Sequence, residues 1–177
     1  MNEDEHHKEV YAHYGLAVYL AQVFESGLIN ALVTLDFMAT NSSHLITKTD
    51  WSDSYDAFFN DNAKLPIGPL LGKLKKFEFF SGDLKVKLEL AAEKRNFLVH
   101  RYFRDNINLF ATEQGREQMI EEFKCCADTF TSADRCLSGI IEPINARYGL
   151  TQQKIDALLE ELFAERKDEN ASGSPSS

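Results

Sequence analysis

The sequence predicts an all-α protein, folded as an up-and-down bundle of four or five helices. Apolar residues recur every three or four positions over long stretches, which is the spacing of a buried helix face. No segment shows the sustained apolar–polar alternation, enriched in β-branched residues, that is typical of strands. Short links separate the helical stretches, and such links favour neighbouring helices that run up and down.

The chain of 177 residues, 44% of them apolar, is long enough for one domain with a sizeable core. We expect that single domain over residues 1–167. Residues 168–177 consist mostly of polar and small residues, with Gly and Pro among them, and this composition predicts a disordered tail.

The first helix is expected from about residue 7 to residue 40. Gly15 and Gly27 lower its helix propensity, yet both would allow a neighbouring helix to approach closely. Residues 41–43, Asn-Ser-Ser, end the pattern. The predicted buried stripe comprises Tyr14, Ala17, Leu20 or Ala21, Phe24, Leu28, Ala31 or Leu32, Leu35 and Met38.

Two shorter helices are expected next. Residues 51–60 follow capping residues and carry inward aromatic side chains. Residues 61–69 contain two prolines and a glycine, so we expect a loop there and a new helix over about 70–80. Residues 81–83, Ser-Gly-Asp, form the turn and cap of the helix that follows.

The second half of the chain is expected to hold three more helical stretches. One covers residues 83–103 and frays into an irregular link over residues 105–110. A long helix over about 115–147 is expected to pair antiparallel with the first helix, with Pro143 kinking or ending it. A short last helix opens at Thr151.

The helix over 83–103 carries the residues that look like chemistry: Arg95, Asn96, His100 and Tyr102. Asn96 and His100, four apart, lie on one face, whereas Arg95 lies on a strip about 100° around the axis. We expect Arg95 in the wall of a cleft and His100 in its floor. Packing against a copy about a two-fold axis would place two arginines and two histidines in that cleft.

The run Arg95-Asn96-x-x-x-His100-x-Tyr102 resembles the Arg-x4-His-x-Tyr signature of the HEPN superfamily. Members are all-helical, and many are dimeric, metal-independent endoribonucleases of toxin–antitoxin and phage-defence systems. The resemblance implies a HEPN-like bundle, a homodimer, an RNA substrate and no metal or other cofactor. It also implies a nucleotidyltransferase antitoxin, which in such pairs adds adenylate to the tyrosine that matches Tyr102.

The residue types suit transesterification of RNA. His100 would act as general base on a ribose 2′-hydroxyl, because imidazole is present in both protonation forms near neutral pH. Arg95 would stabilise charge on the phosphoryl group through its planar, permanently charged fork. Asn96 would orient His100 or a phosphate, and the implied product is a 2′,3′-cyclic phosphate. Tyr102 is a candidate for modification or substrate contact; the alternative is an aromatic residue that packs at a helix end.

Glu25 is a carboxylate in an otherwise apolar part of the first helix, so it requires a cationic partner if buried. We name Arg95 as that partner, with Glu25 as an orienting carboxylate. The alternative is a solvated edge of the buried stripe.

The net charge of −9 is unusual for a protein that approaches a polyanion, but its distribution is uneven. Residues 73–104 hold nine basic and four acidic side chains, a local charge of +5, so the remainder carries −14. Lys94, Arg101 and Arg104 are expected to form a supporting basic face for phosphates. The alternative is an ordinary solvated helix face.

Other site classes find no support in the sequence. The three cysteines, Cys125, Cys126 and Cys136, lack the spacing of a zinc site, and we expect reduced thiols in or near the core. Four histidines are interpreted as surface or core residues: His6, His7, His13 and His44. No apolar run reaches about 18 residues without polar interruption, and the N-terminus is acidic, so we expect a cytoplasmic protein without membrane contact. A catalytically silent helical module that binds RNA, a nucleotide or a partner protein remains the alternative function.

Overall fold

The computed structural model describes residues 3–37, 48–78 and 80–147, together with positions 153 and 157. Helices dominate this part of the chain and it contains no strand, which confirms the all-α class. The chain divides into two compact units, Met1–Ser138 and Gly139–Ser177. The predicted tail lies outside the described residues, as does nearly all of the predicted last helix.

Helix α1 spans Glu3–Leu32 and continues as a π-helix, η1, over Val33–Phe37. The described part of its predicted stripe is buried or half-buried, with Phe24 and Leu28 fully inaccessible, and Met38 lies outside the described residues. A side chain at Gly27 would meet the Asp134 carboxylate of α7 at 2.6 Å, so close approach occurs here as predicted. The same prediction for Gly15 is wrong, because Gly15 is exposed and faces open space.

Helices α3 (Lys48–Ala63) and α4 (Ile67–Leu74) are separated by a short link, because α3 runs beyond its predicted end. Pro66 is the N-cap of α4, earlier than the predicted restart. Asn62 explains the extension of α3. Its side-chain amide accepts a hydrogen bond from Lys73 Nζ at 2.7 Å, which ties the end of α3 to α4.

Helix α5 spans Gly82–His100 and begins where the sequence predicts. Ser81 is its N-cap, and Gly82 adopts φ +55°, a left-handed conformation that glycine tolerates best. The preceding helix, α4, ends before the predicted position. An ion pair of 2.9 Å between Lys75 and Glu89 connects the end of α4 to α5.

A kink at Arg101, with φ −132° and ψ −26°, separates α5 from α6 (Tyr102–Phe110). The prediction that the motif helix continues through residue 103 is therefore wrong. The predicted irregular link over residues 105–110 lies within α6, but Asn106 in it has a non-helical backbone, with φ −122° and ψ 18°. The aromatic side chains of α6 pack into the core, and Asn106 Nδ2 donates to the Tyr102 carbonyl oxygen at 3.0 Å. The irregularity predicted from the polar residues is therefore present at Asn106 and does not extend over the whole stretch.

Helix α7 spans Glu113–Arg147. Thr112 Oγ1 accepts a hydrogen bond from the Gly115 amide at 3.1 Å, which caps the start of the helix. Pro143 lies inside the helix and does not end it.

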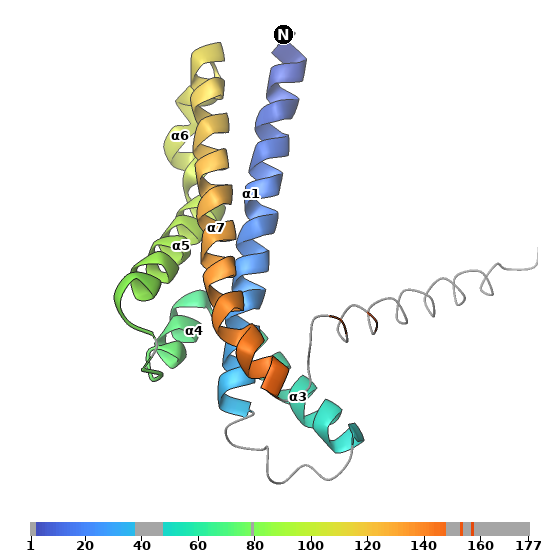
Figure 1. Cartoon of the computed structure of the whole chain (residues 1–177). Helices are drawn as coiled ribbons and strands as arrows, with labels where there is room; N and C mark the ends of the chain where they lie inside the picture. Colours follow the sequence, from blue (N-terminus) through green and yellow to red (C-terminus); the bar gives the residue numbers. More distant parts are fainter. Residues whose placement is uncertain (1–2, 38–47, 79, 148–152, 154–156, 158–177) are drawn as a thin grey trace, which may run out of the picture. The chain divides into compact units, whose positions relative to one another are not determined.

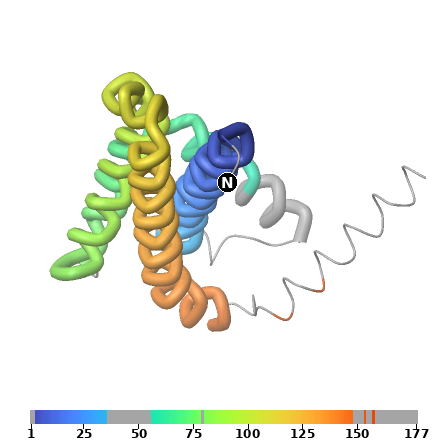
Figure 2. Tube along the Cα trace, turned by 90° about the horizontal axis from the view of Figure 1, so that it is seen from above, coloured from blue at the N-terminus to red at the C-terminus, as the bar shows by residue number. Residues whose placement is uncertain are grey.

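Helices α1 and α7 lie side by side and run parallel (Figures 1 and 2). Contacting residues follow the same order along both helices. Arg116 Nη1 lies 3.5 Å from His7 Nε2, and seven residues further along each helix the ring centroids of Phe123 and Tyr14 lie 5.4 Å apart. The predicted antiparallel pairing is wrong. Since α5 and α6 together carry the chain back along the bundle, α7 starts from the same end as α1.

Phe123 of α7 is the centre of an aromatic cluster and is fully buried. Its ring lies 5.4 Å from Tyr14, 4.6 Å from Tyr102 and 6.3 Å from Phe103, measured between ring centroids. These partners come from α1 and α6. The cluster therefore joins α1, α6 and α7.

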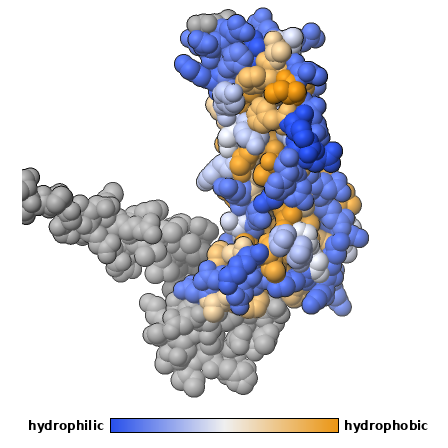
Figure 3. Space-filling view, turned by 180° about the vertical axis from the view of Figure 1, so that it is seen from behind, coloured by the Kyte–Doolittle hydropathy of each residue, from blue (hydrophilic) through white to orange (hydrophobic). Residues whose placement is uncertain are grey.

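Helix α1 also exposes apolar side chains, among them Tyr11, Leu16 and Tyr19. Figure 3 shows that apolar patches interrupt a mostly polar surface. Within the described residues, the stretch Glu3–Leu35 is the one helix whose length and composition would suit a membrane span. The residues that α1 buries inside the fold also contribute to this apolar composition.

Asp134 gives a testable pH dependence. Burial raises the pKa of its carboxyl, and no donor or cation pairs with it in the described part of the chain. Because the pKa of the Asp134 carboxyl is higher in the folded state than in the unfolded state, ionisation of this group lowers the free energy of unfolding. This loss of stability is fully present above the folded-state pKa and is absent below the unfolded-state pKa. We expect Asp134→Asn to raise the melting temperature at pH 7, and the gain to disappear in acid.

Thermal unfolding followed by circular dichroism from pH 7 to pH 3 measures this difference. The exposed Asp128 on the same helix provides the control, since Asp128→Asn should leave the melting temperature unchanged at either pH. A lower melting temperature for Asp134→Asn at pH 7 would show that the carboxylate makes a favourable contact.

Candidate functional site

The structure brings Glu25, Arg95, Asn96 and His100 together at the C-terminal end of α5; we call these four residues the Arg95 cluster. Arg95 Nη2 donates to Glu25 Oε2 at 2.8 Å, and Arg95 Nη1 donates to Asn96 Oδ1 at 3.2 Å. The same Nη1 atom lies 3.5 Å from His100 Nε2. One guanidinium therefore links a carboxylate, an amide and an imidazole.

The helix geometry explains how the cluster is built. Arg95 lies on the face of α5 that also carries the buried Leu88 and Ala91, so its side chain starts from the core side. It reaches Glu25 on α1, and both side chains of this ion pair are about one fifth exposed, at 22% and 21%. The predicted partnership of Glu25 and Arg95 is confirmed.

Asn96 and His100 complete the cluster from the exposed side of α5. His100 is the last residue of α5, directly before the Arg101 kink. The guanidinium is thus held at its base by a partly buried carboxylate, whereas the imidazole is open to solvent. A cation fixed next to an accessible imidazole is an arrangement that binds an anion and transfers a proton.

Tyr102 does not belong to the cluster and is buried, which confirms the alternative of an aromatic residue that packs at a helix end. It is 2% exposed and packs against Phe123 with 4.6 Å between ring centroids. Its hydroxyl donates to Glu122 Oε2 at 2.5 Å. Burial, reinforced by this carboxylate, raises the pKa of Tyr102 far above its ordinary value. The physical cause is the kink at Arg101, after which Tyr102 starts a new helix directed into the core.

Glu122 is the residue of this region that sequence reasoning missed. Its carboxylate accepts a second hydrogen bond, from Gln118 Nε2 at 2.8 Å, within α7. Only the spacing of Gln118 and Glu122, four residues apart on one helix, gives a local signal. The contact with Tyr102 depends on tertiary packing and leaves no mark in the sequence.

The three basic residues expected to support the site are arranged differently from the prediction. Arg101 and Arg104 both pair with Asp105, at 3.2 and 3.0 Å, and the hydrogen bond from Arg104 lowers the pKa of that carboxyl. Lys94 lies about 120° around the α5 axis from His100. Its ammonium contacts Cys125 of α7 at 3.2 Å, so Lys94 does not join the Arg95 cluster.

The histidines outside the cluster fall on the surface or in the core, as far as the structure describes them. His6 is buried, and His7 packs on the ring of Phe110 with 4.8 Å between centroids. His13 is half-buried, and His44 lies outside the described residues. Among the residues that the structure places, no three His, Cys, Asp or Glu side chains gather in a way that would hold a metal ion.

Chemically, the Arg95 cluster combines a fixed cation, an amide and a solvent-open imidazole within about one and a half turns of α5 and its contact to α1. The His100 imidazole is able to accept or donate a proton, and the Arg95 guanidinium is able to contact an anionic group beside it. Comparison with family models, curated proteins and solved structures gives no match to this chain.

Proposed function

We propose that this protein is a HEPN-type, metal-independent endoribonuclease of the cytoplasm, and the toxin of a toxin–antitoxin or phage-defence module. The observation that carries the proposal is the position of Arg95 Nη1, 3.5 Å from His100 Nε2, at a solvent-open end of α5. An arginine and a histidine at this separation are able to contact the same phosphodiester.

In the proposed reaction, His100 removes the proton of a ribose 2′-hydroxyl, which then attacks the adjacent phosphorus. The 5′-oxygen leaves and takes a proton from the imidazolium of a second copy. Arg95 stabilises the negative charge that develops on the phosphoryl oxygens, and Asn96 contacts the guanidinium at 3.2 Å. Glu25, on α1, fixes the orientation of the Arg95 guanidinium through its ion pair and so acts as a positioning residue.

The homodimer in this proposal would form through α5. Val86 and Phe97 lie eleven residues apart on one face of the helix and are 63% and 38% exposed. His100 follows Phe97 after about one turn. Pairing two such faces about a two-fold axis would bury apolar surface and bring two imidazoles to one cleft. A HEPN-like bundle is part of the same proposal.

A nucleotidyltransferase antitoxin is the partner that the family resemblance implies. The buried Tyr102 gives no support to adenylation of the free toxin, since its hydroxyl is bonded to Glu122. Inhibition by direct contact with the solvent-open Arg95 cluster is therefore the form of neutralisation that we propose. The proposed partners are thus RNA, a second copy and this antitoxin.

Cleavage of RNA in EDTA by the purified full-length protein tests the proposal. We expect products with 2′,3′-cyclic phosphate ends, and we expect His100→Ala to lower the cleavage rate by about 10²- to 10⁴-fold, the range for loss of a general base. His13→Ala is the matched control, because His13 lies half-buried on α1 and outside the Arg95 cluster.

Two results would contradict the nuclease. Equal RNA binding without cleavage by the wild type and by His100→Ala would favour the catalytically silent binding module. Cleavage that survives His100→Ala but stops in EDTA would indicate metal-dependent chemistry or a contaminating nuclease. Either outcome rejects the role assigned to the imidazole.

A further inference from the structure

Two lysine–cysteine pairs bracket a groove between the antiparallel helices α5 and α7. Lys94 Nζ lies 3.2 Å from Cys125 Sγ at one end, and Lys87 Nζ lies 3.8 Å from Cys136 Sγ at the other. The two lysines are seven residues apart on α5 and the two cysteines eleven apart on α7, so each pair shares one helix face. This groove lies on a different face of α5 from His100.

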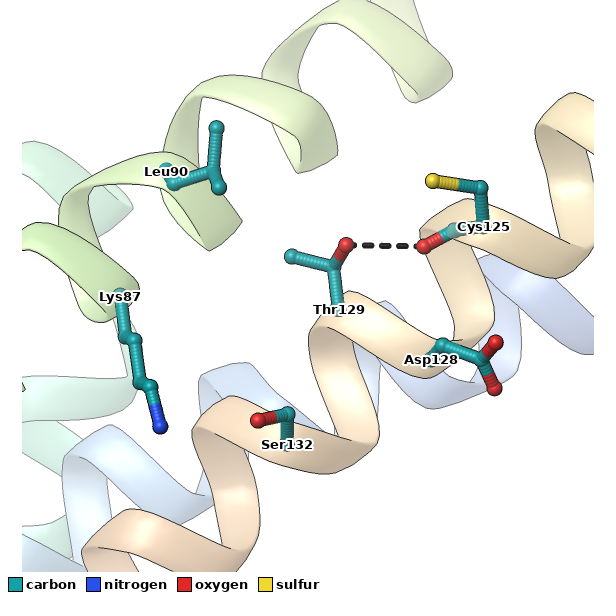
Figure 4. Close-up of a pocket in the computed structure, with 6 residues that line it drawn as sticks. All are labelled: Lys87, Leu90, Cys125, Asp128, Thr129 and Ser132. Atoms are coloured by element: carbon teal, nitrogen blue, oxygen red, sulfur yellow. Dashed lines mark hydrogen bonds between the residues drawn. The ribbon is translucent and has the colours of Figure 1, made fainter.

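The groove contains a pocket of about 300 Å³, with Cys125 in its wall. Figure 4 shows that Cys125 directs its sulfur toward the α5 side, whereas the Asp128 carboxylate points away from Lys87 and Leu90. Thr129 donates its hydroxyl hydrogen to the Cys125 carbonyl oxygen at 2.8 Å and not to the thiol, whose contact is with the Lys94 ammonium. The pocket lining is Lys87, Leu90, Cys125, Asp128, Thr129 and Ser132.

The three cysteines differ sharply in their surroundings. Cys125 is exposed, contacts an ammonium group and lines the pocket. Cys126 is buried, and burial raises the pKa of its thiol, so it reacts poorly at neutral pH. Cys136 is half-buried, has the longer lysine contact and does not line the pocket. The expectation that all three thiols pack in or near the core is wrong for Cys125.

We propose that Cys125 is a site of thiol modification by anionic disulfides, with glutathione disulfide as the representative reagent. A cationic, accessible surrounding is what distinguishes reactive cysteines from structural ones. Lys94 and Lys87 attract the carboxylates of the reagent, and the pocket receives its peptide part. The site is independent of the proposed ribonuclease.

The step is a thiol–disulfide exchange. Cys125 loses its proton to water, and its sulfur attacks one sulfur of the disulfide; the new S–S bond forms as the old one breaks. The departing glutathione sulfur takes the electron pair and then a proton from water. Cys125 is oxidised to the mixed disulfide, and the reagent is reduced to one molecule of glutathione.

Incubation of the full-length protein with glutathione disulfide at neutral pH, followed by intact-mass measurement and peptide mapping, tests the site. We expect one glutathionyl adduct, on Cys125, that dithiothreitol removes. Lys94→Gln should slow adduct formation by about fivefold, the factor that one unit charge at contact distance produces in water. Cystamine, a cationic disulfide, should show no such slowing.

Lys124→Gln is the matched control, because Lys124 adjoins Cys125 in the sequence but its ammonium pairs with Glu121 at 2.6 Å. It removes the same charge without touching the sulfur, so the rate should not change. Equal labelling of Cys125 and Cys136 would overturn the proposal. An equal effect of Lys94→Gln and Lys124→Gln would do so as well.

Discussion

Arg95→Ala should lower RNA cleavage by about 10²- to 10³-fold, the usual cost of removing one group that stabilises transition-state charge. It should also lower the free energy of unfolding by about 1–3 kcal/mol, because Glu25 would lose the partner of its 2.8 Å ion pair in a site that is only one fifth exposed. Cleavage kinetics and urea unfolding measure the two effects separately.

A second substitution separates the proposed catalytic role of Arg95 from its structural role. In Glu25→Ala/Arg95→Ala no unpaired charge remains, so the double variant should be more stable than Arg95→Ala alone. Its RNA cleavage should stay as low as that of the single variant, because the cation is still absent. Recovery of cleavage together with stability would show that Arg95 acts only as scaffold.

Phe123→Ala should lower the free energy of unfolding by about 3–5 kcal/mol, since it removes a fully buried ring and leaves a cavity. The loss should be large because Phe123 contacts rings from both α1 and α6. Urea denaturation at equilibrium measures it.

Tyr19→Ala provides the control for Phe123→Ala. Tyr19 is an aromatic residue of α1 that is 61% exposed, so its loss should change stability by no more than about 0.5 kcal/mol. Similar effects of the two substitutions would mean that the aromatic cluster does not hold the three helices together.

The sequence is sufficient to predict the helix that carries the Arg95 cluster and the partner of Glu25. Both predictions rest on local quantities: apolar residues at helical spacing predict a helix with one buried face, and a carboxylate among apolar residues requires a cation. The contact between Arg95 and His100 follows from the helix and the length of the arginine side chain.

Other features depend on tertiary packing and could not be predicted in this way. Apolar periodicity marks which face of a helix is buried but not its direction, so the parallel course of α1 and α7 leaves no local signal. The kink at Arg101 has no proline or glycine in it. It coincides with the entry of Tyr102 into the aromatic cluster, where it meets Glu122, twenty residues along the chain.

The kink has a consequence for how the site is supported. His100 ends one helix and Tyr102 begins the next, so a single residue joins the solvent-open imidazole to a buried phenol that is hydrogen-bonded to Glu122. Two interactions therefore restrict the position of the His100 imidazole. One is its contact with the Arg95 guanidinium on the same helix, and the other is the hydrogen bond that holds Tyr102, two residues along the chain, in the core. Substitutions on α7 that weaken the hydrogen bond to that hydroxyl would therefore alter the position of the imidazole without touching any residue of the Arg95 cluster.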